Sequence, residues 1–93
     1  MIRSFASKAA EAIFNDQKSP ELPSTIQNMA RRKLVQIDLA QNLNDLRVPP
    51  GNRLEALKGT RLGQHSIRIN VKWCICFKWT PNGVGDVEIV DYR

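Results

Sequence analysis

Groups that bind metals or form disulfide bonds are scarce in this sequence, which has one histidine and two cysteines among 93 residues. Cys74 and Cys76 are two residues apart, so on a strand they would point to the same side, with poor geometry for bridging each other. A zinc site needs more ligands than this pair and the lone His65 provide. We therefore expect two free thiols, no metal site and no cofactor.

Long apolar runs are absent as well. Residues 1–8 have no stretch long enough for a signal sequence, and no later segment approaches the length of a membrane span. These absences predict a cytoplasmic protein with no membrane partner. A chain of this length has room for one domain, which we expect to comprise residues 1–93 and to contain a modest core.

Acidic side chains are scarce in one part of the chain. Residues 47–78 carry seven Lys or Arg residues against a single acidic residue, whereas residues 1–46 carry six against five. The net charge of +5 is ordinary for a nucleic-acid-binding protein but does not by itself identify one. The local excess says more, because cations fixed on rigid strands can hold a phosphate backbone. The sequence therefore favours RNA or DNA as the target.

The first half of the sequence has the spacing of two helices. Residues 2–5 fit a short edge strand, and Ser7 then caps a helix that ends near Asn15. After a linker with two prolines, Ser24 and Gln27 make the capping-box pattern that begins the main helix. The apolar stripe expected on this main helix consists of Ile26, Met29, Ala30, Leu34, Ile37 and either Leu39 or Ala40.

The second half changes to a period of two, which is typical of strands. After a further helical turn at 42–46 and a rigid loop at 48–52, turns at 70–72 and 81–83 separate strands, the last at 87–92. The predicted fold is α+β, with two N-terminal helices packed on one face of a small, mainly antiparallel sheet. That face should hold Ile67, Ile69, Val71, Trp73, Ile75, Phe77 and Trp79. The other face should be open and carry Arg68, Cys74, Cys76 and Lys78, with Arg68 near Cys74.

Four long segments, in this order, resemble the HigB toxins of the RelE superfamily. They are residues 49–59 (PPGNRLEALKG), 63–70 (GQHSIRIN), 73–77 (WCICF) and 87–92 (VEIVDY). The resemblance implies a toxin of a bacterial type II toxin–antitoxin pair, an endoribonuclease that cuts messenger RNA in the ribosomal A site without a metal. It also implies silencing by a helix-turn-helix antitoxin, HigA, with operator DNA bound only through the toxin–antitoxin complex.

The resemblance also assigns roles to individual residues. By matching positions, Lys58 and Arg68 would stabilise the phosphate during cleavage, Arg61 would contact phosphate or ribosomal RNA, and Tyr92 would stack or transfer a proton. His65 has a side chain suited to proton transfer. Further RNA contacts are expected from Arg31, Arg32, Arg53, Lys78 and Arg93.

Several of these residues have a plainer interpretation. Lys58 and Arg61 flank Gly59 in a turn, where exposed charge is common. His65 stands at the start of a strand, where it would satisfy a hydrogen bond. Charges such as Arg31 and Arg32 on the polar side of a helix are most often only solvated.

The chain departs from the family pattern at two positions. After the strand tryptophan the family has arginine where this chain has Cys74, and the family ends Asp-Tyr-His where this chain ends with Arg93. A thiol supplies no cation, and an arginine does not titrate near neutral pH. Two interpretations therefore stay open, an attenuated endoribonuclease and a catalytically silent homologue that binds its antitoxin. Gyrase inhibition, as in the ParE branch of the superfamily, is a third.

Overall fold

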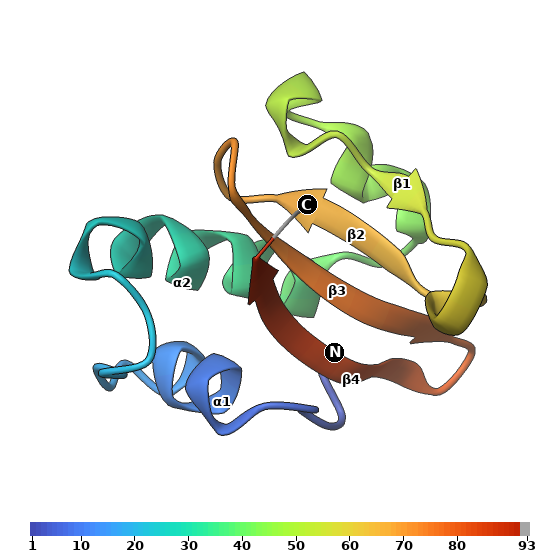
Figure 1. The fold of residues 1–93 in the computed structure, drawn as a ribbon. Coiled ribbons are helices and arrows are strands. Elements are labelled where there is room, and N and C mark those ends of the chain that lie inside the picture. Colours follow the sequence, from blue (N-terminus) through green and yellow to red (C-terminus); the bar gives the residue numbers. More distant parts are fainter. Residues whose placement is uncertain (92–93) are drawn as a thin grey trace.

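The structure, a computed structural model, describes residues 1–91. It contains two α-helices and a four-stranded antiparallel sheet with the strand order β1-β2-β3-β4 (Figure 1). The predicted α+β class is confirmed. The elements are α1 (Lys8–Phe14), α2 (Ser24–Leu39), η1 (Leu43–Arg47), η2 (Pro50–Asn52), β1 (Glu55–Ala56), η3 (Gly59–Arg61), β2 (His65–Arg68), β3 (Trp73–Thr80) and β4 (Gly83–Asp91), where η denotes a 3-10 helix. Within residues 1–91, no helix has both the length and the apolar character needed to cross a membrane.

Helix α1 begins as its sequence predicts. The Ser7 hydroxyl oxygen accepts a hydrogen bond from the backbone N–H of Ala10 at 3.2 Å. The expected edge strand at residues 2–5 is reduced to two isolated parallel bridges beside β4, Ile2 with Val84 and Phe5 with Val87. The N-terminal segment thus contributes two bridges to the sheet edge rather than a full strand.

Helix α2 begins at Ser24, but the predicted capping box does not form. Pro23 is the N-cap residue and makes no side-chain capping hydrogen bond. The buried amide of Gln27 instead donates to the carbonyl oxygens of Ser19 at 2.8 Å and Leu22 at 2.9 Å, and so holds the linker against the helix. The prediction was wrong because Oε1 of Gln27, which a capping box would use to accept from the N-cap backbone N–H, instead accepts from the backbone N–H of Ser19 at 3.4 Å.

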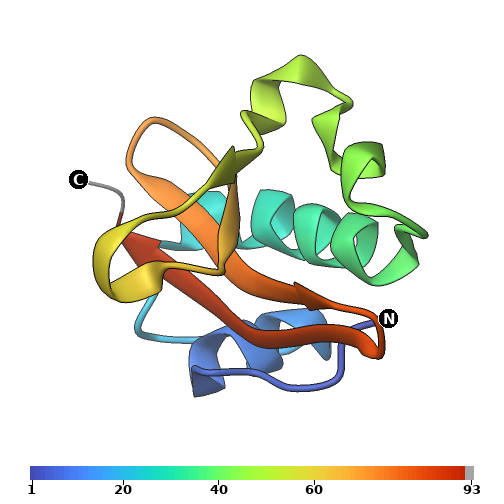
Figure 2. The ribbon, with the colours of Figure 1, turned by 90° about the vertical axis from the view of Figure 1, so that its right-hand side faces the viewer.

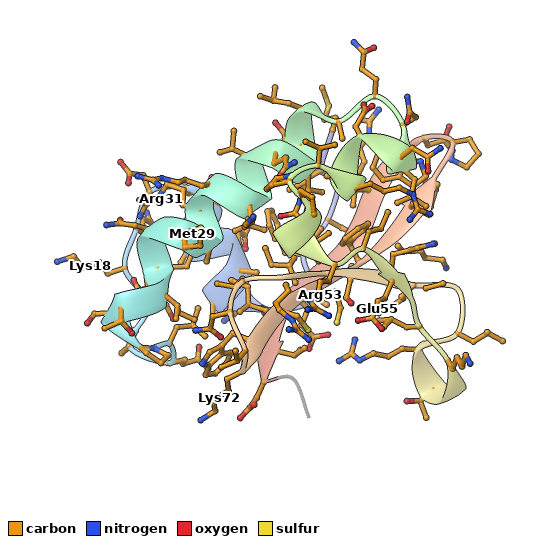
Figure 3. All side chains as sticks on the ribbon, turned by 90° about the horizontal axis from the view of Figure 1, so that it is seen from above. Lys18, Met29, Arg31, Arg53, Glu55 and Lys72 are labelled. Atoms are coloured by element: carbon orange, nitrogen blue, oxygen red, sulfur yellow. The ribbon has the colours of Figure 1, made fainter. Side chains whose placement is uncertain are left out.

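The apolar stripe of α2 is narrower than the sequence suggests. Ile26, Ala30, Leu34 and Ile37 are buried together with apolar residues of α1 and of the sheet in one core cluster. Met29 and Leu39 are exposed, and the outward position of Met29 on α2 is visible in Figure 3. Ala40, the alternative to Leu39, packs against the core.

The predicted strand register is confirmed for β2 and β3, but Val71 was wrongly expected on the core face, because it lies in the turn between these strands and is 85% exposed. Ile75 and Phe77 are fully buried in the core, and Trp73 is half-buried against it. Because neighbouring residues of a strand face opposite ways, Cys74 and Cys76 point away from that core. Arg68 pairs with Cys74 in the register of β2 and β3, as expected.

The face away from the core is nevertheless not open, as the sequence had suggested. Cys74 and Cys76 are only 3% and 2% exposed, and Ser66 beside them is also buried. The connection between β1 and β2, yellow in Figure 2, covers this part of the sheet, since its Leu57 and Arg61 line one cavity with both cysteines. The expectation failed because strand alternation shows which way a side chain points but not which distant segment lies over it.

Candidate functional site

A small cavity on the covered face of the sheet contains one predicted site residue, Arg61, together with Cys74, which stands where the family pattern has arginine. Its volume is about 200 Å³. We call it the thiol–arginine cavity, and it is lined by Leu57, Arg61, Ser66, Cys74, Cys76, Val90 and Asp91. These residues come from β2, β3, β4 and the connection between β1 and β2, so a rigid sheet forms its floor.

Arg61 is held over the sheet by two partners. Its Nη1 atom donates to Oε1 of Gln64 and to Oε1 of Glu88, both at 3.1 Å, and the contact with Glu88 is also an ion pair. Gly59, the first residue of η3, and Gly63, two residues after its end, have φ of 65° and 93°, conformations that side-chain-bearing residues rarely adopt. These two glycines allow the chain to turn so that Arg61 reaches β4.

The charge of Arg61 is firmly fixed. Partial burial lowers the pKa of its guanidinium, but the hydrogen bond to Glu88 and the negative character of Cys76, Glu88 and Cys74 raise the pKa by more. Arg61 therefore brings a permanent positive charge to the cavity.

The two thiols form a contact pair at the floor of the cavity. Both cysteines are free, and their Sγ atoms are 3.9 Å apart in a weak hydrogen bond. This hydrogen bond, followed by burial, raises the pKa of Cys74. The same hydrogen bond lowers the pKa of Cys76, with burial opposing the decrease and Arg61 adding to it. Cys76 is therefore the thiol that loses its proton more easily.

Other predicted cations lie around this cavity but do not line it. Arg68 is half-buried at the end of β2, directly opposite Cys74. Lys58 is exposed and immediately precedes η3. Lys78 is exposed two residues beyond Cys76, where β3 and β4 shift register, and Arg53 is exposed before β1.

The arginines of α2 belong to a different surface. Arg31 donates to the carbonyl oxygen of Ile13 and pairs with Asp16, each at 3.2 Å, and so ties α2 to the end of α1. Arg31 and Arg32 line a separate hollow with Asn28 and Val35. Figure 3 shows Arg31 on α2 and Arg53 with Glu55 on the segment that enters β1. The structure does not bring Arg31 and Arg32 together with Arg61.

His65 points to the other side of the sheet. It pairs with Phe77 in the register, and the two rings stack with their centroids 6.3 Å apart. Among the described residues, its Nδ1 atom is buried without a hydrogen-bond partner. The structure thus separates His65 from the thiol–arginine cavity. Tyr92 and Arg93, the remaining predicted site residues, lie outside the described residues.

Sequence reasoning did not single out Glu88 or Cys76 as site residues. Glu88 stands between the buried residues Val87 and Ile89 of β4, and this alternation could have placed it on the opposite face. Cys76 faces Glu88 in the register of β3 and β4. No local sequence pattern predicts the contact of Glu88 with Arg61, because the two residues are 27 positions apart in the chain.

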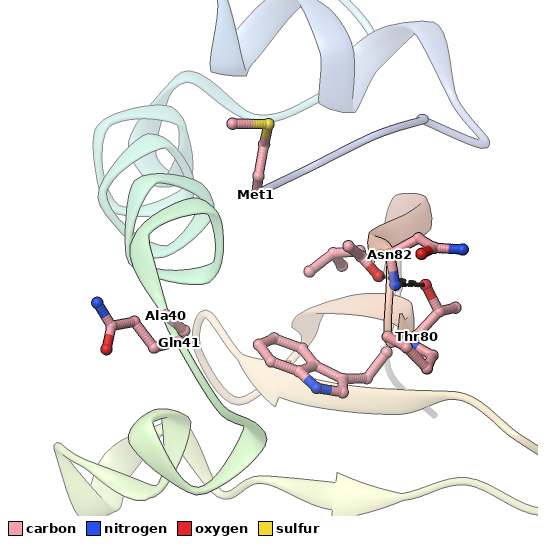
Figure 4. Close-up of a pocket in the computed structure, with 9 residues that line it drawn as sticks. Met1, Ala40, Gln41, Thr80 and Asn82 are labelled. Atoms are coloured by element: carbon pink, nitrogen blue, oxygen red, sulfur yellow. Dashed lines mark hydrogen bonds between the residues drawn. The ribbon is translucent and has the colours of Figure 1, made fainter.

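A hollow larger than the thiol–arginine cavity lies at the far end of the sheet, but the described residues of its lining lack side chains suited to acid–base or nucleophilic catalysis. Its volume is about 320 Å³, and it is lined by Met1, Ala40, Gln41, Trp79, Thr80, Pro81, Asn82, Gly83 and Val84 (Figure 4). None of these described residues has a titratable side chain. Thr80 uses its hydroxyl to close the β3–β4 turn, donating to Gly83 at 2.7 Å and accepting from Asn82 at 3.2 Å. The thiol–arginine cavity is therefore the better candidate site.

A family model and a curated relative point to the same family. Residues 3–93 match the family model of the RelE-like toxin of the type II toxin–antitoxin system HigB. Toxin HigB-1 of Vibrio cholerae is 44% identical over 80 residues, which are 85% of this chain and 84% of that protein. An uncharacterized protein of Haemophilus influenzae is 39% identical over 69 residues, covering 74% and 68% of the two chains.

The fold has a relative among solved structures. A chain of the YoeB–YefM complex from Staphylococcus aureus superposes with a TM-score of 0.61. The match covers 100% of this chain and 98% of that chain at 17% identity, so it shows a common fold and nothing finer.

Proposed function

This chain belongs to the RelE-like HigB toxins of type II toxin–antitoxin systems, and we propose that it is an endoribonuclease that cleaves messenger RNA on the ribosome and so inhibits translation. The proposed reaction site is the thiol–arginine cavity together with Arg68 and Lys58 beside it. One observation supports this site above all. A permanent cation, Arg61, is anchored over a rigid sheet and lines a cavity with Cys74, whose register partner on β2 is a second arginine, Arg68.

The chemistry suited to these residues is attack of the ribose 2′-oxygen on the adjacent phosphorus. The hydroxyl loses its proton, a bond from oxygen to phosphorus forms, and the bond to the 5′-oxygen breaks as that oxygen gains a proton. Negative charge accumulates on the phosphate oxygens in between. We assign its stabilisation to Arg68, Arg61 and Lys58, because guanidinium groups bind phosphate oxygens through paired donors and a fixed cation needs no reorganisation. The scheme requires no metal.

Proton transfer is assigned to residues at or beyond the end of β4. The resemblance to the family gives Tyr92 a stacking or proton-transfer role and leaves Arg93, which replaces a histidine, with an RNA contact only. His65 is the other residue proposed for proton transfer. Its ring, however, lies on the core side of β2, away from the cavity. Arg53 and Lys78 are exposed cations at the rim and would contact RNA outside the cleavage point.

Family membership also suggests the partners. We propose a HigA-like helix-turn-helix antitoxin as the inhibitor, the ribosome and messenger RNA as targets, and operator DNA as a ligand of the toxin–antitoxin complex only. The setting would be the bacterial cytoplasm. Co-expression with the helix-turn-helix protein of the neighbouring gene should give a stable complex and should relieve any growth defect. If neither occurs, the regulatory part of the proposal is wrong.

The test of the enzymatic part is cleavage of messenger RNA in programmed ribosomes. Replacing Arg61→Ala should slow cleavage by about 100-fold, the typical effect of losing one preorganised donor. Lys18→Ala removes the same charge from the exposed linker between α1 and α2, away from β1 in Figure 3, and should leave the rate unchanged. Equal rates for the two variants would contradict the proposed site.

A catalytically silent homologue is the second candidate, favoured by Cys74. Where the family has an arginine, this chain has a buried thiol that gives a phosphate no positive charge. Such a protein would bind its antitoxin and occupy the basic surface without cutting RNA. Antitoxin binding combined with undetectable cleavage, both by this chain and by its Cys74→Arg variant, would favour this candidate.

A further inference from the structure

Cys74 and Cys76 have no role in the proposed RNA cleavage, yet they form the most unusual feature of the cavity. Both thiols are free, both point away from the apolar core, and their sulfur atoms are 3.9 Å apart. They are 3% and 2% exposed, so only a small ligand that enters the cavity of about 200 Å³ can reach them. The pair is therefore a candidate binding site for something small that bonds to sulfur.

The spacing of the sulfurs suits one bridging atom better than a disulfide bond. A disulfide needs the two sulfurs at about 2.05 Å, and residues two apart on a strand have Cα atoms separated by roughly 6.7 Å, near the upper limit for such a bond. β3 is paired on both sides, with β2 and with β4, which resists the movement required. A single atom bonded to each sulfur at about 2.3 Å would instead span 3.9 Å with an angle of roughly 115°.

The ligand set indicates the class of ion. In residues 1–91 no group of three or more His, Cys, Asp or Glu side chains is arranged to hold a metal, so the protein supplies the two sulfurs alone. Zinc in structural sites takes four protein ligands, and Ca²⁺ and Mg²⁺ take oxygen ligands. Thiolates select soft ions such as Cu(I). We propose that Cys74 and Cys76 together bind one soft monovalent ion of the Cu(I) class, with any further ligand coming from solution.

The charge of the cavity is matched to this ion. As each sulfur bonds to the ion its proton passes to solvent, so binding releases up to two protons and transfers no electron. Two thiolates and one monovalent cation leave a single negative charge in the cavity. Arg61 lines the same cavity, interacts electrostatically with both sulfurs and is anchored by Glu88 and Gln64, so it compensates that charge.

The test is titration of the reduced full chain with Cu(I) under argon, with a chromophoric Cu(I) chelator as competitor and with Ag(I) as a redox-inert probe. One ion per chain is expected by native mass spectrometry. Cys74→Ser and Cys76→Ser should each weaken binding by at least about 100-fold, since loss of a direct ligand should cost more than loss of an outer-shell partner. Ser66→Ala, which alters the same cavity but keeps both thiols, should bind normally.

A measurement on the unchanged chain guards against variants that fail to fold. X-ray absorption at the copper edge should show at least two sulfur atoms directly bonded to the ion. Fewer than two sulfurs, undisturbed binding in either serine variant, or a chain that forms a Cys74–Cys76 disulfide and takes up no ion would each overturn the proposal. These readouts count ions and bonds, so they hold or fail independently of RNA cleavage.

Discussion

Arg68 on β2 and Cys74 on β3 are direct partners in the antiparallel register, and Cys74 faces the cavity in which Arg61 is anchored. A side chain at position 74 therefore lies beside Arg68 and lines the same cavity as Arg61. This relationship makes position 74 the point at which the phosphate-binding strength of the surface is most easily changed.

Cys74→Arg should raise ribosome-dependent cleavage by about 100-fold, because it adds one preorganised donor beside the phosphate. The rate of messenger cleavage in programmed ribosomes measures the effect. Cys74→Met adds comparable length without charge and should produce no gain. Adding Arg93→His to this variant should raise the cleavage rate further, because it restores a group that titrates near neutral pH. The two increases in rate need not multiply, because both substitutions act on the same transition state. A Cys74→Arg rate equal to that of the unchanged chain would show that this position is not the missing cation.

Arg68→Ala should remove most of the remaining cleavage, with a loss of about 100-fold. Arg68→Lys keeps the charge but loses the paired donors, so an intermediate rate is expected. Because Arg68 is half-buried at the end of a strand, its free energy of unfolding in urea should change by less than about 1 kcal/mol. A loss of activity that merely follows a large loss of stability would count against a role at the phosphate.

Asn52 supplies a stability prediction that involves no catalytic group. It is the last residue of η2 and is fully buried, donates to the carbonyl oxygen of Leu46 and to Oε1 of Gln36, each at 3.1 Å, and accepts from Lys33. Asn52→Ala would leave these buried partners unsatisfied, and we expect the free energy of unfolding to fall by about 2–3 kcal/mol.

The matched control for Asn52 is Asn28→Ala, since Asn28 is exposed on α2 and bonds the exposed end of Arg31. Its free energy of unfolding should change by less than about 0.5 kcal/mol. Thermal or urea unfolding followed by circular dichroism measures both variants. Similar changes in the two would show that the hydrogen bonds of Asn52 contribute little.

Local patterns predicted the parts of the fold that depend on local physics. The period of two in β3 fixed the inward direction of Ile75 and Phe77, and the pairing of Arg68 with Cys74 followed from the turn between their strands. The patterns gave wrong predictions where a side chain contacts residues from another part of the chain. Gln27 binds linker carbonyls instead of capping α2, and both cysteines are covered by a segment that the ion pair of Arg61 with Glu88 holds in place. Such contacts leave no periodic signal in the sequence.

The unequal acidity of the two thiols gives the last prediction. The hydrogen bond between the sulfurs, followed by Arg61, lowers the pKa of Cys76, whereas the same hydrogen bond and burial raise the pKa of Cys74. The thiolate is the nucleophile, so iodoacetamide that enters the cavity should label Cys76 first, with a midpoint at lower pH than that of Cys74. Arg61→Ala removes the cation and should move this midpoint to higher pH, while Lys18→Ala should leave it in place. Mass spectrometry of peptides from samples quenched across a pH series follows each cysteine separately. Faster labelling of Cys74, or a midpoint insensitive to Arg61→Ala, would show that Arg61 does not govern the charge on this pair.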